Sequence, residues 1–163
     1  MSAIFSPCGR FRYRLDRKVA DTGVVAALVG VNPSTAGAVE NDQTIRKDLG
    51  FARLHGWRRI VKGNLFGYRA TDVRALASAP DPIGPDNDQH LISIFYEVDI
   101  VVAAWGPTAK LPARLRNRWR TVLELAEACG KEMWSFGVAQ DGQPRHTLML
   151  PYSTPLVPWP SLA

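Results

Sequence analysis

Two short apolar runs, each closed by a glycine, limit most strongly what this chain can fold into. Residues 24–29 and 100–105 are apolar on both faces, and Gly30 and Gly106 follow them directly. Such strands are typical of the centre of a parallel sheet that helices cover. The two runs therefore predict central strands of an α/β domain.

Helix-like and strand-like patterns alternate along the rest of the chain. Apolar residues recur at helical spacing in three segments: 42–56, 86–98 and 112–129. Four further segments have the patterns of short strands: 10–15, 59–65, 133–136 and 148–150. The alternation predicts a three-layer sandwich, in which a mostly parallel sheet is covered by helices on both faces.

The whole chain, residues 1–163, fits a single α/β domain. With 46% hydrophobic residues it can bury a core without metal or disulfide staples. We expect an N-terminal edge strand or hairpin over residues 10–20. The proline-rich tail, residues 151–163, is expected to run in extended form over the surface.

Charge and cysteine content narrow the possible partners. A formal charge of +5 favours nucleic acid or anionic small molecules as ligands at low salt. No apolar run approaches the ~20 residues of a membrane span, so we expect a cytoplasmic protein without a membrane partner. Cys8 and Cys129 are too few for a four-cysteine metal site. We expect free thiols and no metal or other cofactor, and the sequence does not indicate an oligomeric state.

Polar residues follow the apolar runs where α/β sheets bind ligands, beyond the carboxyl ends of the strands. The first such loop is 30–36, and a helix start at 41–44 follows it. Asn32 is expected to point its amide into the crevice, whereas Ser34 and Thr35 suit either a helix cap or a ligand. The candidate ligand-binding residues here are Gly30, Asn32, Pro33, Ser34, Thr35, Asn41, Asp42 and Thr44.

Later strand-end loops supply further candidates. A buried amide without a partner costs about 1–3 kcal/mol, so Asn64 must bind either backbone or ligand. Arg69 suits a phosphate or carboxylate ligand, or a surface salt bridge. The complete set from these loops is Asn64, Phe66, Arg69, Gly106, Arg145 and His146.

Four arginines alternate along the segment predicted as the last helix. They are Arg114, Arg116, Arg118 and Arg120. A solvated basic helix and a surface that follows phosphates are both compatible with this spacing.

The order of these motifs resembles the uracil-DNA glycosylase superfamily. There a first strand ends in Gly-x-Asn/Asp-Pro, a second in Asn, a third in apolar-Leu-Gly, and a late loop carries His-Pro-Ser. The matching stretches here are 30–33, 64–69, 101–106 and 145–148. The chain is also similar to an uncharacterised bacterial family with the motifs Asn-Pro-Ser-Thr-Ala and Asn-Asp-x-Thr, present at 32–36 and 41–44.

The resemblance implies a uracil-DNA-glycosylase-like fold and N-glycosidic-bond hydrolysis, as in DNA repair. It assigns Asn32 to the attacking water, Asn64 to the base and His146 to hydrogen-bond donation toward the departing base. Cleavage passes through an oxocarbenium-like sugar while negative charge develops on the base. An asparagine orients water but cannot take its proton. Thr147 and Leu148 replace the Pro-Ser that follows the histidine in the superfamily.

Other function classes fit the same residues. A non-catalytic module that binds a nucleotide or nucleic acid agrees with the basic charge. Ser34 could act as a hydrolase nucleophile with His146 and Asp42, although the Gly-x-Ser-x-Gly motif is absent. The tail with Trp159 could instead bind a protein partner. DNA, RNA and a free nucleotide are equally compatible ligands at this point.

Overall fold

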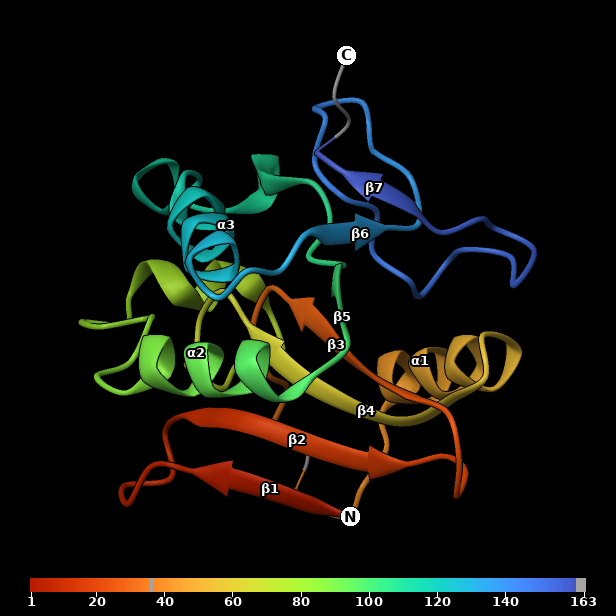
Figure 1. Cartoon of the computed structure of the whole chain (residues 1–163). Coiled ribbons are helices and arrows are strands. Elements are labelled where there is room, and N and C mark those ends of the chain that lie inside the picture. The colour runs from red at the N-terminus through yellow and green to blue at the C-terminus, as the bar shows by residue number, and fades with distance from the viewer. Residues whose placement is uncertain (36, 161–163) are drawn as a thin grey trace.

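The computed structural model describes residues 1–35 and 37–160 (Figure 1). Ala36 of the predicted ligand loop and residues 161–163 of the tail lie outside this description. Seven strands form one sheet: β1 (Ser2–Phe5), β2 (Arg12–Lys18), β3 (Val24–Gly30), β4 (Trp57–Asn64), β5 (Ile100–Ala103), β6 (Met133–Ser135) and β7 (Val157–Trp159). The α-helices are α1 (Gln43–Leu54), α2 (Asn87–Glu97) and α3 (Arg118–Ala128). Three 3₁₀ turns are η1 (Val73–Ala77), η2 (Thr108–Lys110) and η3 (Ala113–Leu115).

The sheet is mixed, with the strand order β1-β2-β4-β3-β5-β6-β7. β4, β3, β5 and β6 pair in parallel, as predicted for the centre. The pairs β1–β2, β2–β4 and β6–β7 are antiparallel, so the parallel pairs are confined to the centre of the sheet. A consequence for the site is that the amino end of β2 lies at the same edge of the sheet as the carboxyl end of β4.

Side chains of β3 alternate between two hydrophobic clusters, because successive residues of a strand point to opposite faces. Ala26 and Leu28 pack with the apolar residues of α1. Val25, Ala27 and Val29 pack with apolar residues of α2 and α3. Figure 1 likewise shows α1 apart from the pair α2 and α3. Within the described part of the chain, no helix has the length and apolar character of a membrane span.

Helix α1 begins and ends as the sequence predicted. Asp42 Oδ1 accepts the Ile45 N–H at 2.8 Å and caps the first turn. Gly56, with φ of 68°, follows the helix in the left-handed conformation that favours glycine. The cap matters for function, because it places the first turn of α1 beside the end of β3.

Two expectations about the C-terminal half were wrong, and one strand was not predicted. The helix predicted over 112–129 begins only at Arg118, after the 3₁₀ turn η3. Residues 148–150 form a turn, whose Leu148 N–H is used by a side chain and not by a strand. The missing strand comes from the tail as β7, which pairs with β6 and buries Trp159 against Trp105. Of the two N-terminal alternatives, β2 is a hairpin arm: it pairs with the preceding strand β1, which takes the edge of the sheet.

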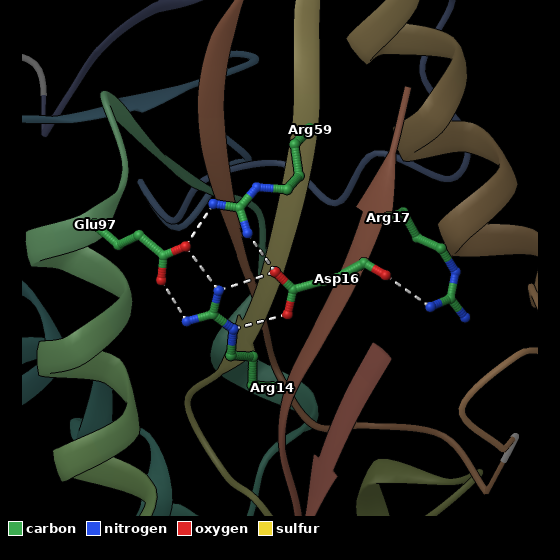
Figure 2. A network of polar contacts seen from close by, with 5 residues as sticks. All are labelled: Arg14, Asp16, Arg17, Arg59 and Glu97. Carbon is green, nitrogen blue, oxygen red and sulfur yellow. Dashed lines mark hydrogen bonds and ion pairs between the residues drawn. The ribbon is translucent and has the colours of Figure 1, made fainter. Parts of the chain in front are cut away.

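An ion-pair ring of Arg14, Asp16, Arg59 and Glu97 fastens β2 to β4 and to the end of α2 (Figure 2). Arg14 contacts Asp16 at 2.7 Å and Glu97 at 2.6 Å, and Arg59 contacts the same two carboxylates. Arg17 donates to the main-chain oxygen of Asp16 at 2.9 Å on the other side of the strand. The antiparallel strand β2 is therefore held in the sheet by ion pairs as well as by its main-chain hydrogen bonds.

Replacing Glu97 by glutamine should lower the free energy of unfolding at pH 7 by up to about 1 kcal/mol, because solvent screens a side chain that is 37% exposed. Hydrogen bonds from Arg14 and then Arg59 lower the pKa of Glu97 from 4.5 to about 2. A carboxylate with a lowered pKa stabilises the fold above its unfolded pKa and loses that contribution as pH falls through its folded pKa. In urea denaturation, the difference between wild type and Glu97→Gln should shrink between pH 4.5 and 2. A difference that does not change with pH would contradict this assignment.

Candidate functional site

A cavity of about 460 Å³ lies at the carboxyl ends of β3 and β4; we call it the strand-end cavity. Four parts of the chain line it: the start of β2, the loop from β3 into α1, the end of β4 with residues 70–73, and the loop around His146. Seven predicted site residues meet in its lining: Gly30, Asn32, Ser34, Asp42, Thr44, Asn64 and His146. The three residues assigned by the resemblance thus share one cavity.

Asn32 holds the first loop in place with its amide nitrogen. Nδ2 donates to the carbonyl of Pro33 at 3.1 Å and to that of Ala70 at 2.8 Å. These two bonds fix which end of the amide is the donor. Oδ1 accepts no hydrogen bond from the described residues, so an acceptor on Asn32 is available at the cavity.

Asn64 presents a buried amide to the cavity. The residue is 5% exposed, and its side chain makes no hydrogen bond with the described residues. Gly30 provides the room, because a Cβ at Gly30 would lie 2.9 Å from Asn64 Oδ1. An amide offers both a donor and an acceptor, and one left unsatisfied in the interior costs about 1–3 kcal/mol. Asn64 is therefore suited to a planar ligand with a donor and an acceptor side by side.

His146 is held as a neutral donor. Its Nδ1 accepts the Leu148 N–H at 3.1 Å, so the neutral ring carries its proton on Nε2. Burial lowers the pKa of His146 below its ordinary value, and the nearby Lys62 ammonium lowers it further, while Asp48 and Asp42 oppose the shift. At neutral pH the ring offers the cavity an N–H group without a charge.

A buried ion pair contacts the loop that carries His146. Lys62 Nζ contacts Asp48 Oδ2 at 2.8 Å, and the Thr147 hydroxyl donates to Asp48 Oδ1 at 2.6 Å. Lys62 is 5% exposed and Asp48 is fully buried. Because Lys62 comes from β4, Asp48 from α1 and Thr147 from the loop of His146, the pair joins three elements that line the cavity.

Lys62 and Asp48 were not among the predicted site residues, although the sequence carried a signal for both. Lys62 interrupts the apolar run of β4, and Asp48 occupies the apolar stripe of α1 between Ile45 and Leu49. Two opposite charges at positions that the hydrophobic pattern assigns to the core are expected to form an ion pair. A buried charge without a partner costs a large amount of folding free energy.

Asp42 is the one carboxylate among the described residues that line the cavity. Oδ1 caps the helix through the Ile45 N–H, which leaves Oδ2 for other contacts. The carboxylate can accept a proton, which the amides of Asn32 and Asn64 cannot do. Thr44 lies in the first turn of the same helix and also lines the cavity.

Arg12 was not predicted, yet it lines the cavity with only 4% of the residue exposed. The main-chain N–H of Arg12 donates to the Gly67 carbonyl at 2.9 Å, which extends the β2–β4 pairing past the end of β4. Burial lowers the pKa of Arg12 to about 10, against the raising effect of Asp42, and the nearby Arg69 and Arg17 lower it further.

Several predicted site residues have structural roles instead. Asn41 Oδ1 accepts from Arg17 Nε at 2.7 Å. Arg69 donates to the carbonyls of Gly9 and Thr35, at 3.0 and 2.7 Å, and so fastens two loops. Phe66 is fully buried in the core and does not reach the cavity.

The remaining predicted residues lie beside the lining. Pro33 is buried, and its carbonyl accepts from Asn32 and from the Ala70 N–H. Gly106 has φ of 78°, and a Cβ there would lie 3.3 Å from His146 Cβ, so it makes room for the histidine loop. Arg145 is exposed and outside the lining.

Three of the four arginines before and within α3 make hydrogen bonds within the chain. Arg114 donates to the Ala77 carbonyl at 3.0 Å, and Arg116 donates to the Leu111 carbonyl at 3.0 Å. Arg118 is buried, donates to the Leu65 carbonyl at 2.9 Å and pairs with Asp88. These arginines bind main-chain oxygens that would otherwise be unsatisfied.

Comparison with known proteins supplies a family but no activity. The family model described as "Protein of unknown function (DUF1643)" matches residues 12–148. Neither the curated proteins nor the solved structures contain a match to the chain.

Cys8 and Cys129 are free thiols, and no cluster of three or more metal-ligating side chains occurs among residues 1–35 and 37–160.

Replacing Asp48 by alanine should lower the free energy of unfolding by about 3–5 kcal/mol, because it leaves the Lys62 ammonium buried without a partner. The double variant Lys62→Met, Asp48→Ala removes the stranded charge and should recover part of the loss. Urea denaturation of both variants measures this. Equal losses in the single and double variants would show that the charge pairing is not what stabilises the site.

The ring of His146 should be neutral at pH 7, with its proton on Nε2, in ¹H–¹⁵N spectra of the imidazole. Its titration midpoint should lie below 6.5, because burial disfavours the charged form. The same ring in urea-unfolded protein gives the reference. A proton on Nδ1, or a midpoint above that of the unfolded chain, would contradict the geometry described here.

Proposed function

The chain belongs to the DUF1643 family of proteins of unknown function, and we propose from its strand-end cavity that it recognises a nucleobase and hydrolyses an N-glycosidic bond. The base belongs to nucleic acid or to a nucleotide. One observation carries the proposal: Asn32, Asn64 and His146, far apart in the chain, line one cavity. Its volume of about 460 Å³ lies in the range of small-molecule sites.

The base is recognised by hydrogen bonds to its edge. The Asn64 amide supplies a donor and an acceptor, and His146 Nε2–H supplies a second donor. Both side chains are held in place, since Asn64 packs against Gly30 and the His146 ring accepts the Leu148 N–H. A site with buried polar groups rejects ligands that leave these groups unpaired.

The reaction breaks the bond between the sugar C1′ and the base nitrogen. Asn32 Oδ1 orients a water molecule, whose oxygen bonds to C1′ while the water proton passes to the Asp42 carboxylate. The base leaves with the electron pair of the broken bond, and His146 Nε2–H stabilises its negative charge. Uptake of a proton completes the free base, and the sugar keeps the new hydroxyl group.

We extend the proposal to the fold, as a uracil-DNA-glycosylase-like three-layer sandwich. The two hydrophobic clusters, one with α1 and one with α2 and α3, support helices on both faces of the sheet. The strand-end motifs also occur in the order that the resemblance requires.

The geometry disfavours a serine hydrolase. Ser34 and His146 both line the cavity, but His146 Nδ1 is occupied by the Leu148 N–H and Nε2 carries the ring proton. The histidine therefore has no free lone pair to take a proton from Ser34. A second candidate is a module that binds a nucleotide without turnover, and it is favoured by the use of the Asn32 amide nitrogen in holding the loop.

We expect the wild-type protein to release free base from at least one of a set of oligonucleotides and nucleotides that carry uracil, hypoxanthine or 8-oxoguanine. Asp42→Asn keeps the helix cap but cannot accept a proton, so it should lower the rate about a hundred- to ten-thousand-fold. Glu40→Gln makes the same chemical change outside the cavity and should leave the rate unchanged. Chromatography of the released base measures all three proteins.

If no base is released, binding measurements distinguish the glycosidic-bond hydrolase from the binding module. Salt-dependent binding of nucleotides without turnover would favour the binding module. The absence of both release and binding would rule out the proposed function. An Asp42→Asn protein as active as wild type would exclude Asp42 as the proton acceptor.

A further inference from the structure

One wall of the strand-end cavity carries positive charge that base recognition does not use. Arg12 lines the cavity and is 4% exposed, and Arg17 and Arg69 lie near enough to act on its charge. We call Arg12, Arg17 and Arg69 the arginine cluster. Burying a guanidinium costs free energy, and two like charges beside it add to that cost.

Arg17 and Arg69 hold other parts of the chain in place. Arg17 donates to Asn41 and to the main-chain oxygens of Asp16 and Glu40. Arg69 binds two carbonyls, as described above. Arg12 is the member that lines the cavity, and Asp42 is the lining carboxylate whose charge acts on it. Two further guanidinium groups and this one carboxylate act on the charge of Arg12, and the excess of positive charge favours an anion beside it.

The first turn of α1 adds to the same wall. Gln43 and Thr44 line the cavity, and Asp42 caps only the Ile45 N–H. The N–H groups of Gln43 and Thr44 have no acceptor among the described residues. The amino end of a helix binds phosphate through such groups and through the helix dipole.

A second feature of the same cavity, independent of its charge, is an amide that makes no hydrogen bond with the described residues. Asn64 is 5% exposed, and its amide faces the cavity without a partner among the described residues. The cavity thus has a neutral side, with Asn64 and His146, that can form hydrogen bonds with a base. Its cationic side, with Arg12, has no role in the proposed recognition of the base.

We propose that the ligand is a nucleoside phosphate, and that its phosphate binds between the Arg12 guanidinium and the first turn of α1. The inference rests on the proposed function, because it places the base at Asn64 and His146. It excludes a free base and an unphosphorylated nucleoside as the preferred ligand. The phosphate is a terminal ester of a mononucleotide or a diester within a strand.

The test compares nucleosides with their 5′-monophosphates by isothermal titration calorimetry at low salt. Monophosphates should bind wild type about ten- to hundred-fold more tightly, since charged hydrogen bonds contribute about 1.5–3 kcal/mol. Arg12→Met should remove most of this difference, and Arg12→Lys part of it, because lysine keeps the charge but not the planar fork. Arg10→Met removes the same charge from an exposed residue outside the cavity and should keep the difference.

A measurement on wild type covers the case in which an Arg12 variant does not fold. Inorganic phosphate should shift the ¹H–¹⁵N resonance of the Arg12 side chain, and that of Arg10 should stay in place. A short oligonucleotide without terminal phosphates distinguishes the sources of the phosphate. Binding that Arg12→Met weakens indicates a diester, whereas binding of mononucleotides alone indicates a terminal ester.

The outcomes keep this inference apart from the proposed function. Equal affinity for nucleosides and monophosphates would overturn the phosphate site and leave base recognition standing. A phosphate-induced shift of Arg12 with no binding of any nucleoside or nucleotide would support the anion site and overturn base recognition. No shift of Arg12 together with unchanged affinities in Arg12→Lys would also refute the inference.

Discussion

The buried pair of Lys62 and Asp48 joins the strand, the helix and the loop from which the strand-end cavity is built. Neither charge could remain in the core alone, because the desolvation of each is compensated only by the other and by the hydroxyl of Thr147. The position of α1 relative to β4 is therefore coupled to the loop that carries His146. A polar connection of this kind constrains geometry more narrowly than apolar packing, since it requires specific distances between specific atoms.

The reversed direction of β2 decides the electrostatic character of the cavity. Parallel strands bring only their carboxyl ends to this edge, but an antiparallel neighbour brings its amino end there. Arg12 reaches the cavity for this reason. The ion-pair ring that includes Arg14 and Glu97 holds β2 in that register. The ring therefore also helps to position Arg12, which lies at the start of the same strand.

Sequence patterning located those cavity-lining residues that lie at or just after a strand of the parallel centre. Asn64 is the last residue of β4, Asn32 follows β3 by two residues, and both line the cavity. The same patterning did not indicate the partners of Arg69, whose guanidinium binds two carbonyls. Which partners a long side chain finds depends on loops from elsewhere in the chain, and local patterning contains no information about them.

The sequence by itself determined the parallel central strands, the capped start of α1 and the edge of the sheet at which polar groups gather. These depend on hydrophobic periodicity and on turn chemistry, which act over a few neighbouring residues. Only the tertiary structure decided that β2 is antiparallel, that the tail supplies β7, and that Arg12 and Lys62 join the cavity lining. Such features arise from pairings between residues distant in the chain, whose free energy comes from burial and charge compensation in the assembled fold.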